Sequence, residues 1–322
     1  MIRKAAVFYN PLSGRRQGRR LRDVEEVLGV LRGAGVEGSA TPTQGSASTG
    51  AQAREALAGG CDTVFVCGGD GTIHDVAQEM AGSEAALAIV PLGTANALAH
   101  DLGLPLSPAA AAQAALAAER RRVAVGKIEC QDLSGNRASH LFLVTAGIGV
   151  DAHLFYRLDP FAKRRFGMAS YYARALHLWL THRMQNFCVE IGEPDGGTSL
   201  QCSDVSQLLA VRIRNFGGVL RELAPGACLE EAQLRTVLFR TRGRMRYLAY
   251  ILRGLLGARW EIADIELRSA ASIKCDYASD SPAGPRCPRI FVEADGELLG
   301  TLPAKVSLVP DGLTLLFPKR RA

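Results

Sequence analysis

Short apolar runs alternate with longer amphipathic segments along the first third of the chain. Runs of about five apolar or β-branched residues are typical of buried strands, and apolar residues three or four apart are typical of helices packed on a sheet. The runs predict strands at residues 5–9, 36–41, 63–67 and 88–92. The amphipathic spacing predicts helices at residues 21–31, 51–58, 73–80 and 108–119, with a polar loop at 45–49. This alternation favours a parallel α/β sheet, in which the loops after the strands bind ligands.

The pattern changes near Val123, where short strands begin to dominate. Strands are predicted at residues 127–131, 141–145, 187–191, 207–214, 234–240, 262–268, 272–276, 289–294 and 305–310. Helices are predicted at residues 161–183 and 242–256. Turns rich in proline, glycine and acidic residues separate the strands, as in antiparallel sheets. The predicted fold class is therefore an α/β N-terminal domain with a parallel sheet, followed by a mostly antiparallel β-sandwich domain.

Composition and charge change this picture little. Apolar residues make up 48% of the chain and charged residues 22%, as in ordinary globular proteins. The net charge of +6 favours anionic partners only weakly. No nucleic-acid recognition motif accompanies this charge, so we expect no nucleic-acid partner.

The cysteines and the absence of a long apolar segment bear on location. The eight cysteines form no Cys-x-x-Cys pair, and the chain enters a predicted strand almost at once. We therefore expect no signal peptide, reduced thiols and a cytoplasmic protein. No segment is long and apolar enough to span a bilayer, so any membrane contact should be peripheral.

Candidate chemistry enters with the sequence Gly68-Gly-Asp-Gly-Thr72, which lies between a predicted buried strand and a predicted helix. Glycines allow backbone N–H groups to approach a phosphate, and the N-terminus of a helix favours negative charge. Asp70 would repel a phosphate unless a metal ion or a transferable proton lay between them, so the loop indicates phosphoryl transfer with Mg²⁺. The alternative is an ordinary strand-to-helix turn in which the glycines only permit tight packing.

Together, several motifs in a fixed order resemble a known family. They are Asn10-Pro-Leu-Ser-Gly14, Gly68-Gly-Asp-Gly-Thr72, Pro91-Leu-Gly-Thr-Ala-Asn96, Ala146-Gly-Ile-Gly-Val-Asp-Ala152 and Asp295-Gly-Glu297. The chain resembles the diacylglycerol kinase catalytic-domain family along nearly its whole length. Within that family it is similar to soluble bacterial lipid kinases and, more distantly, to sphingosine and ceramide kinases. Any one motif is weak, since Gly-Gly-Asp-Gly alone also occurs in NAD kinases and phosphofructokinases.

The resemblance implies a domain organisation and a function. It implies an NAD kinase-like nucleotide domain at residues 1–125, to which a final segment at about 304–322 returns. It implies a lipid-binding β-sandwich at residues 126–303. The implied activity is ATP-dependent phosphorylation of a lipid hydroxyl with Mg²⁺, at a membrane surface and within phospholipid biosynthesis. The oligomeric state is left open, with a homodimer as one state considered.

Site residues also follow from the resemblance. Thr41 would contact ATP, residues 69–75 would wrap the phosphates, and Thr94 would reach the nucleotide. The implied ATP-binding set is Asn10, Thr41, Gly68, Gly69, Asp70, Gly71, Thr72, Ile73, His74, Asp75, Thr94 and Asn96. Glu297 matches the family's proton acceptor, and Asp70 and Asp295 would support metal and hydroxyl geometry.

Elementary chemistry agrees with that assignment of Glu297. A lipid hydroxyl is a poor nucleophile at neutral pH, and a carboxylate within hydrogen-bond reach can take its proton. Positioning and Mg²⁺ should supply most of the remaining rate enhancement. The alternative for Asp295-Gly-Glu297 is a simple hairpin turn, for which Asp-Gly is a common sequence.

Two departures from the family pattern weaken parts of this assignment. His74-Asp75 stands where the family usually has Asn-Glu, and His74 either donates a hydrogen bond or lies on an exposed helix face. Relatives hold a structural Mg²⁺ through Asp-Asp-Gly, where this chain has Glu230-Glu231-Ala232. If that metal is kept, Glu231 would be its side-chain ligand, with backbone oxygens of Cys228 and Gln233. An exposed acidic turn is the favoured alternative, because a longer carboxylate would crowd a rigid octahedral site.

Three functions therefore remain open from the sequence. The leading one is a lipid kinase whose acceptor is a diacylglycerol-like or sphingoid lipid. The others are an NAD kinase-like phosphotransferase and a catalytically silent lipid-binding module. The basic, aromatic helix expected at 161–183 could lie on an anionic bilayer through Lys163, Arg164 and Arg165, although a domain-covering helix is favoured.

Overall fold

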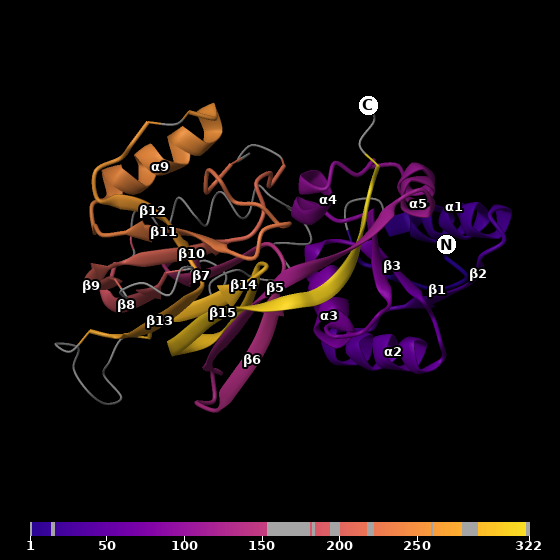
Figure 1. Cartoon of the computed structure of the whole chain (residues 1–322), viewed down its shortest axis with the longest axis horizontal. Coiled ribbons are helices and arrows are strands. Elements are labelled where there is room, and N and C mark those ends of the chain that lie inside the picture. The colour runs from indigo at the N-terminus through magenta and orange to yellow at the C-terminus, as the bar shows by residue number, and fades with distance from the viewer. Residues whose placement is uncertain are drawn as a thin grey trace. The chain divides into compact units, whose positions relative to one another are not determined.

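The computed structural model describes residues 2–13, 17–152, 181, 184–193, 200–217, 222–258, 260–278 and 289–319. The chain divides into two compact units (Figure 1). Unit 1 comprises Met1–Val125, Asn215–Gly217 and Pro310–Ala322, and unit 2 comprises Gly126–Arg214 and Gly218–Val309. The predicted helix at 161–183, with its Lys163–Arg165 cluster, lies outside the described residues except for Thr181.

Unit 1 is built on a parallel sheet. Its strands run in the spatial order β4, β3, β1, β2, with bounds β1 (Lys4–Tyr9), β2 (Glu37–Pro42), β3 (Thr63–Gly68) and β4 (Ala86–Pro91). The last part of β15 (Glu297–Phe317) pairs with β4 in parallel, through Thr314 opposite Ala86. All parallel neighbours end at one edge of the sheet, so the loops that follow β1, β3 and β4 start there.

Helices cover both faces of that sheet (Figure 1). They are α1 (Arg20–Gly33), α2 (Ser46–Ala58), α3 (Asp70–Met80), α4 (Ala97–Asp101) and α5 (Pro108–Leu116), preceded by the 3₁₀ helix η1 (Gln17–Arg19). The apolar stripe of α1 packs with α5 against strand residues that include Val7 and Phe65. The burial of this stripe, rather than intrinsic helix propensity, supplies most of the stability of such a helix.

Unit 2 consists of antiparallel ladders. One ladder joins β12 (Ile265–Ala270), β11 (Leu234–Phe239), β10 (Gln207–Val211), β7 (Thr145–Gly149) and β14 (Phe291–Ala294) to β15. The other joins β9 (Leu200–Val205), β8 (Phe187–Gly192) and β13 (Ser272–Tyr277) to β15, while β5 (Glu119–Gln131) pairs with both β15 and β6 (Arg137–Phe142). The predicted fold class, a parallel α/β domain followed by a mostly antiparallel sandwich, is confirmed.

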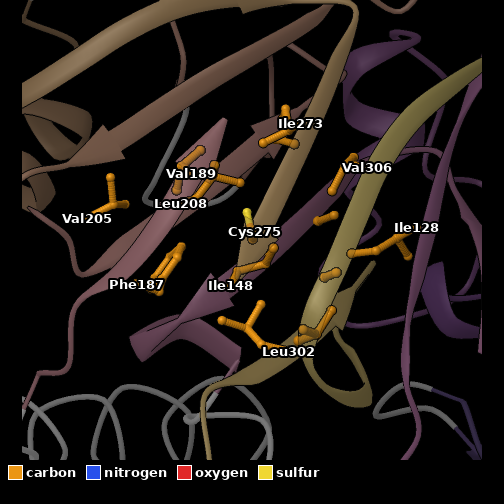
Figure 2. Close-up of a cluster of buried hydrophobic side chains, with 14 of the residues drawn as sticks. Ile128, Ile148, Phe187, Val189, Val205, Leu208, Ile273, Cys275, Leu302 and Val306 are labelled. Carbon is orange, nitrogen blue, oxygen red and sulfur yellow. The ribbon is translucent and has the colours of Figure 1, made fainter. Parts of the chain in front are cut away.

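The core of unit 2 lies between these ladders (Figure 2). Ile148 of β7 and Leu208 of β10 point toward Ile273 and Cys275 of β13, and all four side chains are fully buried. The alternation of buried and less buried residues along β8 and β13 matches the period of a half-buried strand. Helix α9 (Arg244–Leu256) packs Tyr247 onto the ring of Phe239, at 4.6 Å between ring centroids.

Several element predictions differ from the structure. The polar loop predicted at 45–49 is mostly the first turn of α2, because Gly45 caps that helix and Thr49 Oγ1 donates to the Gly45 carbonyl (2.9 Å). The strand predicted at 305–310 is one part of the much longer β15. This strand pairs first with β14, then with β13 and finally with β4, so no single alternation marks its length. Strand β9 and the short helix α4 were not predicted.

The hydropathy of the helices gives one further finding. Among the described residues, no helix is both long enough and apolar enough to cross a bilayer.

Candidate active site

The glycine loop after β3 and the loop after β4 meet backbone to backbone in unit 1. A Cβ atom on Gly93 would lie 2.4 Å from Gly69 Cα and 2.7 Å from Asn96 Oδ1. A Cβ atom on Gly69 would lie 3.1 Å from Gly93 Cα. Real Cβ atoms essentially never approach to 2.4 Å, so position 93 requires glycine for this contact, and a side chain at position 69 would push the neighbouring backbone away, independently of any ligand.

The loop after β1 joins the same group. Asn10 Nδ2 donates to Thr72 Oγ1 (3.5 Å), and Asn10 Oδ1 accepts from the N–H of Leu12 (2.9 Å). Ser13 Oγ donates to the carbonyl of Leu92 (3.4 Å). The structure thus brings together the loops at residues 10–13, 68–72 and 93–96, as the sheet topology predicts. Gly14 lies outside the described residues.

The N-terminus of α3 lies at the centre of these loops. Its N-cap is Gly69, so no side chain at that position covers the N–H groups of the first helical turn. Such N–H groups lack partners within the helix and, with the helix dipole, favour an anion. The arrangement fits a bound phosphate group.

Several side chains in the first turns of α3 are buried in unit 1. Thr72, Ile73 and His74 are buried, and His74 Nε2 lies 3.4 Å from Gln78 Nε2. The alternative that His74 lies on an exposed helix face is therefore wrong. Its burial follows from helical spacing, because residues 73, 76, 77 and 80 form the apolar face and residue 74 adjoins it.

Asp70 holds the third loop. Its two carboxylate oxygens accept from the N–H groups of Ala97 (3.2 Å) and Leu98 (3.3 Å) at the start of α4. Asn96, in the left-handed region at φ 52°, accepts from the N–H of Gly93 through Oδ1 (2.8 Å). Metal support by Asp70 stays a prediction beside this structural role.

The remaining three residues predicted to bind nucleotide lie in the same unit, and Asp75 is half-buried in α3. Thr41 is on β2 opposite Phe8 of β1, near the strand end from which the ligand loops start. Thr94 is exposed in the loop between β4 and α4. Their contacts with nucleotide stay predictions.

Arg20 was not identified from the sequence as a site residue. Its buried guanidinium donates to the carbonyls of Ser13 and Leu92 (3.1 Å to Leu92) and pairs with Asp23 at 3.4 Å. It therefore ties the first loop to the third. Burial lowers the pKa of Arg20, and the Asp23 carboxylate opposes that change. A signal was present, because Arg20 shares the helix face of the apolar residues at positions 24, 27 and 31.

The Asp295-Gly-Glu297 motif forms a tight hairpin in unit 2. Asp295 (φ 50°) and Gly296 (φ 83°) both have positive φ between β14 and β15, as in a type I′ turn. The Asp295 carboxylate accepts from three successive N–H groups, of Leu143 (2.9 Å), Val144 (2.9 Å) and Thr145 (3.0 Å). Asp295 thus fixes the hairpin, and the exposed Glu297 follows it as the first residue of β15.

Two carboxyl groups, of Glu293 and Asp151, lie next to Gly147 near this hairpin. Glu293 is fully buried and its Oε2 accepts from the N–H of Gly296 (3.0 Å). A Cβ atom on Gly147 would lie 2.6 Å from Glu293 Oε1 and 3.0 Å from Asp151 Oδ2, so both carboxyl groups lie against this glycine. Burial raises the pKa of Asp151 to about 6. Burial, and then the charge of Asp151, raises the pKa of Glu293 well above its ordinary value.

The turn predicted to hold a structural metal receives hydrogen bonds from Arg212. The carbonyl oxygens of Glu231 and Gln233 accept hydrogen bonds from the Arg212 guanidinium. The exposed Glu231 carboxylate accepts instead from the side-chain amide of Gln233. Among the described residues, no group of three or more His, Cys, Asp or Glu side chains could hold a metal ion. Two of the three predicted ligand oxygens, the Gln233 carbonyl and the Glu231 carboxylate, already accept hydrogen bonds, so the residues present at 228–233 do not fit a structural metal.

The chain thus combines a parallel α/β unit that carries glycine-rich loops with a mostly antiparallel sandwich, and comparison with known proteins identifies the family. Residues 4–128 match the diacylglycerol kinase catalytic domain, and residues 144–317 match the YegS C-terminal NAD kinase beta sandwich-like domain. The chain belongs to the family that combines these two domains.

Relatives span the whole chain. A diacylglycerol kinase from Mycobacterium tuberculosis is 26% identical over 319 residues, covering 99% of this chain and 96% of the relative. One from Bacillus subtilis is 25% identical over 324 residues, covering 100% and 98%. A crystal structure of a diacylglycerol kinase from Bacillus anthracis superposes with a TM-score of 0.70 at 20% identity, covering 99% and 98% of the two chains. That last likeness shows the fold alone.

Proposed function

We propose that this protein is an ATP-dependent lipid kinase that transfers the γ-phosphoryl group to a hydroxyl of a diacylglycerol-like or sphingoid lipid. The single observation behind the proposal is the contact of Gly69 with Gly93 at the N-terminus of α3. This contact leaves a side-chain-free, N–H-rich surface of the kind that binds a phosphate chain. Membership of the family and the full-length relatives named diacylglycerol kinase support the same activity.

In this proposal unit 1 binds the nucleotide. Backbone N–H groups of residues 69–71 orient the terminal phosphates, while Asn10, Thr72 and Asn96 keep the three loops in register. Asp70 is the residue that would contact Mg²⁺, since Mg²⁺ prefers carboxylate, phosphate and water oxygens. Mg²⁺, when bound, neutralises charge on the transferring phosphoryl group.

Unit 2 supplies the proton acceptor in this proposal. Glu297 is an exposed carboxylate on a hairpin that Asp295 fixes through three N–H groups. It takes the proton of the lipid hydroxyl as the oxygen attacks the γ-phosphorus, while the bond from the γ-phosphorus to the bridging oxygen of the β-phosphate breaks and ADP leaves. Asp295 is then a positioning residue rather than the base. The lipid is met at a membrane surface through peripheral contact.

One assay tests the proposal. Purified protein, Mg²⁺ and γ-labelled ATP are incubated with vesicles that contain diacylglycerol or a sphingoid base, and separately with NAD. Label in a lipid supports the proposal, and label in NADP replaces it with an NAD kinase-like activity. No transfer to any acceptor, while the protein still binds ATP, favours a silent lipid-binding module.

A further inference from the structure

Arg212 is a buried cation that the proposed chemistry does not use. It follows β10, has no exposed surface and is the largest fully buried side chain among the described residues. Its Nη1 donates to the carbonyls of Glu231 and Gln233, both at 2.6 Å, and its Nη2 donates to the carbonyl of Leu229 at 2.9 Å. Three backbone oxygens of one turn therefore converge on a single guanidinium.

Convergence of carbonyl oxygens in a turn creates a site for positive charge. Each oxygen is the negative end of a peptide dipole, and burial of several together costs free energy unless a donor or a cation satisfies them. Burial lowers the pKa of Arg212 to about 10, so the guanidinium stays protonated at neutral pH. The charges of Cys228 and Glu231 oppose that lowering of the pKa.

The same arginine links this turn to the hairpin that bears Glu297. Its backbone N–H donates to the carbonyl of Val144 (2.9 Å), and the N–H of Val144 donates to the Asp295 carboxylate (2.9 Å). The segment before the turn is also held through its backbone oxygens. Arg235 Nε donates to the carbonyl of Pro225 (2.8 Å). The hydroxyl of Tyr250 donates to the carbonyl of Leu223 (2.7 Å).

We propose that the guanidinium of Arg212 is the resident cation of the turn at 229–233, in place of the structural Mg²⁺ that the family resemblance implies. Unit 2 then folds without any divalent ion. The substitutions at 231 and 232 agree with this, because a turn whose oxygens face Arg212 needs neither a short carboxylate nor a glycine to enclose a metal. The inference concerns folding and does not rest on the proposed function.

Thermal unfolding of the full-length protein without nucleotide tests the proposal. The Tm should be the same in EDTA, in Mg²⁺ and in Ca²⁺. A fall of several degrees in EDTA that Mg²⁺ or Ca²⁺ reverses would overturn it. This measurement needs no variant, so it decides the question even if substitutions at 212 prevent folding.

Variants test the role of the arginine itself. Arg212→Met keeps an unbranched apolar stem but leaves the oxygens without donors, and should lower the Tm by roughly 10 °C. The matched control is Arg240→Met, which removes the same charge from ion pairs with Asp204 and Glu266 at a side chain that is 39% exposed. It should change the Tm by no more than about 2 °C. Equal losses in the two variants would contradict the proposal.

A charge comparison separates a cation from a mere hydrogen-bond donor. Arg212→Lys keeps a positive charge, whereas Arg212→Gln keeps N–H donors without charge. The Lys variant should have the higher Tm, and a Gln variant at least as stable as the Lys variant would overturn the assignment. A protein with an EDTA-independent Tm but no kinase activity would leave this inference standing and remove only the proposed function.

Discussion

The two units each contain a buried arginine that donates to loop carbonyls, and the two arginines differ in how their charge is balanced. Arg20 of unit 1 donates to Ser13 and Leu92 and has the carboxylate of Asp23 at 3.4 Å. Arg212 of unit 2 donates to three carbonyls of one turn. A guanidinium can thus be buried beside a carboxylate or among converging peptide dipoles, because either arrangement replaces its lost hydration.

This difference between the two arginines matches the ligands that we propose for the two loop regions. In unit 1 the carbonyl side of the loops is tied back to Arg20, and we propose that N–H groups at the start of α3 bind an anion. In unit 2 the carbonyl side faces inward and the chain supplies its own cation. Under these two proposals the loops of unit 1 bind a ligand, whereas the turn of unit 2 needs no added cation.

The largest expected effect is on the rate of transfer to lipid, in a variant that leaves the hydrogen bonds of both buried arginines intact. Glu297→Gln removes the proposed proton acceptor but no hydrogen bond of either network, so transfer to lipid should fall by about 10²–10⁴-fold. Nucleotide affinity and Tm should stay unchanged. Glu261→Gln, at another exposed carboxylate of unit 2, is the control and should keep full activity. Normal turnover of Glu297→Gln would show that the base is another group.

The next largest effect comes from a substitution in the loops of unit 1 that we propose bind phosphate. Gly93→Ala puts a methyl group 2.4 Å from Gly69 Cα, so the two loops must separate and the N–H groups at α3 must shift. ATP affinity, measured by calorimetry, should fall at least tenfold, with a loss of about 1–3 kcal/mol in unfolding free energy. Gly29→Ala is the control, since nothing lies within 4 Å of its Cβ and the residue is in α1. That variant should be neutral or up to about 1 kcal/mol more stable.

A third substitution sharpens the comparison of the two arginines. Arg20→Met leaves buried carbonyls without a donor and Asp23 without its partner, so the unfolding free energy should fall by about 1–3 kcal/mol. ATP affinity should fall too, because Arg20 joins two of the phosphate loops. Arg22→Met on the same helix removes an exposed pair with Glu26 and should cost less than about 0.5 kcal/mol. Denaturant melts and ATP titrations of both variants give the answer, and equal behaviour would contradict the role given to Arg20.

The smallest expected effect depends on pH. The pKa of Glu293 is raised in the folded state by burial and by Asp151, so the native protein holds a proton that the unfolded chain releases above its ordinary pKa. Stability from this group is therefore complete at low pH and declines as the pH rises from about 4.3 toward the folded pKa. Glu293→Gln keeps the shape without the titration, so its Tm should fall less than that of the wild type between pH 5 and 8.

At pH 5, where Glu293 is protonated in the folded protein, the substitution itself should change the free energy of unfolding by less than about 1 kcal/mol, because the Gln amide can still accept from the N–H of Gly296. Glu261→Gln, at an exposed site, serves as the control and should leave the pH profile of the Tm unaltered. Parallel profiles for the wild type and Glu293→Gln would show that Glu293 is ionised in the folded protein.

Much of the fold could be predicted because local patterns and burial agree. The strands around residues 5–9 and 63–67 are apolar throughout, as expected for a sheet covered on both faces. The spacing of the glycines at 68, 69 and 93 predicted loops that lie together, as the close approach of Gly93 to Gly69 shows, whereas phosphate binding by these loops stays a prediction. The long strand β15 could not be predicted whole, because it changes neighbours along its length and each neighbour imposes a different pattern.

By itself, the sequence determined the two fold classes, the order of the motifs and the residue types that can bind a phosphate or accept a proton. The tertiary structure alone decided which backbone groups those side chains satisfy. Asp70 and Asp295 were expected to support a metal, and each accepts from N–H groups far away in the chain. Arg20, Arg212 and Glu293 showed their roles only in three dimensions. The reason is physical: a backbone donor or acceptor is the same in every residue, so the partner of a buried charge depends on where the folded chain brings the peptide groups together.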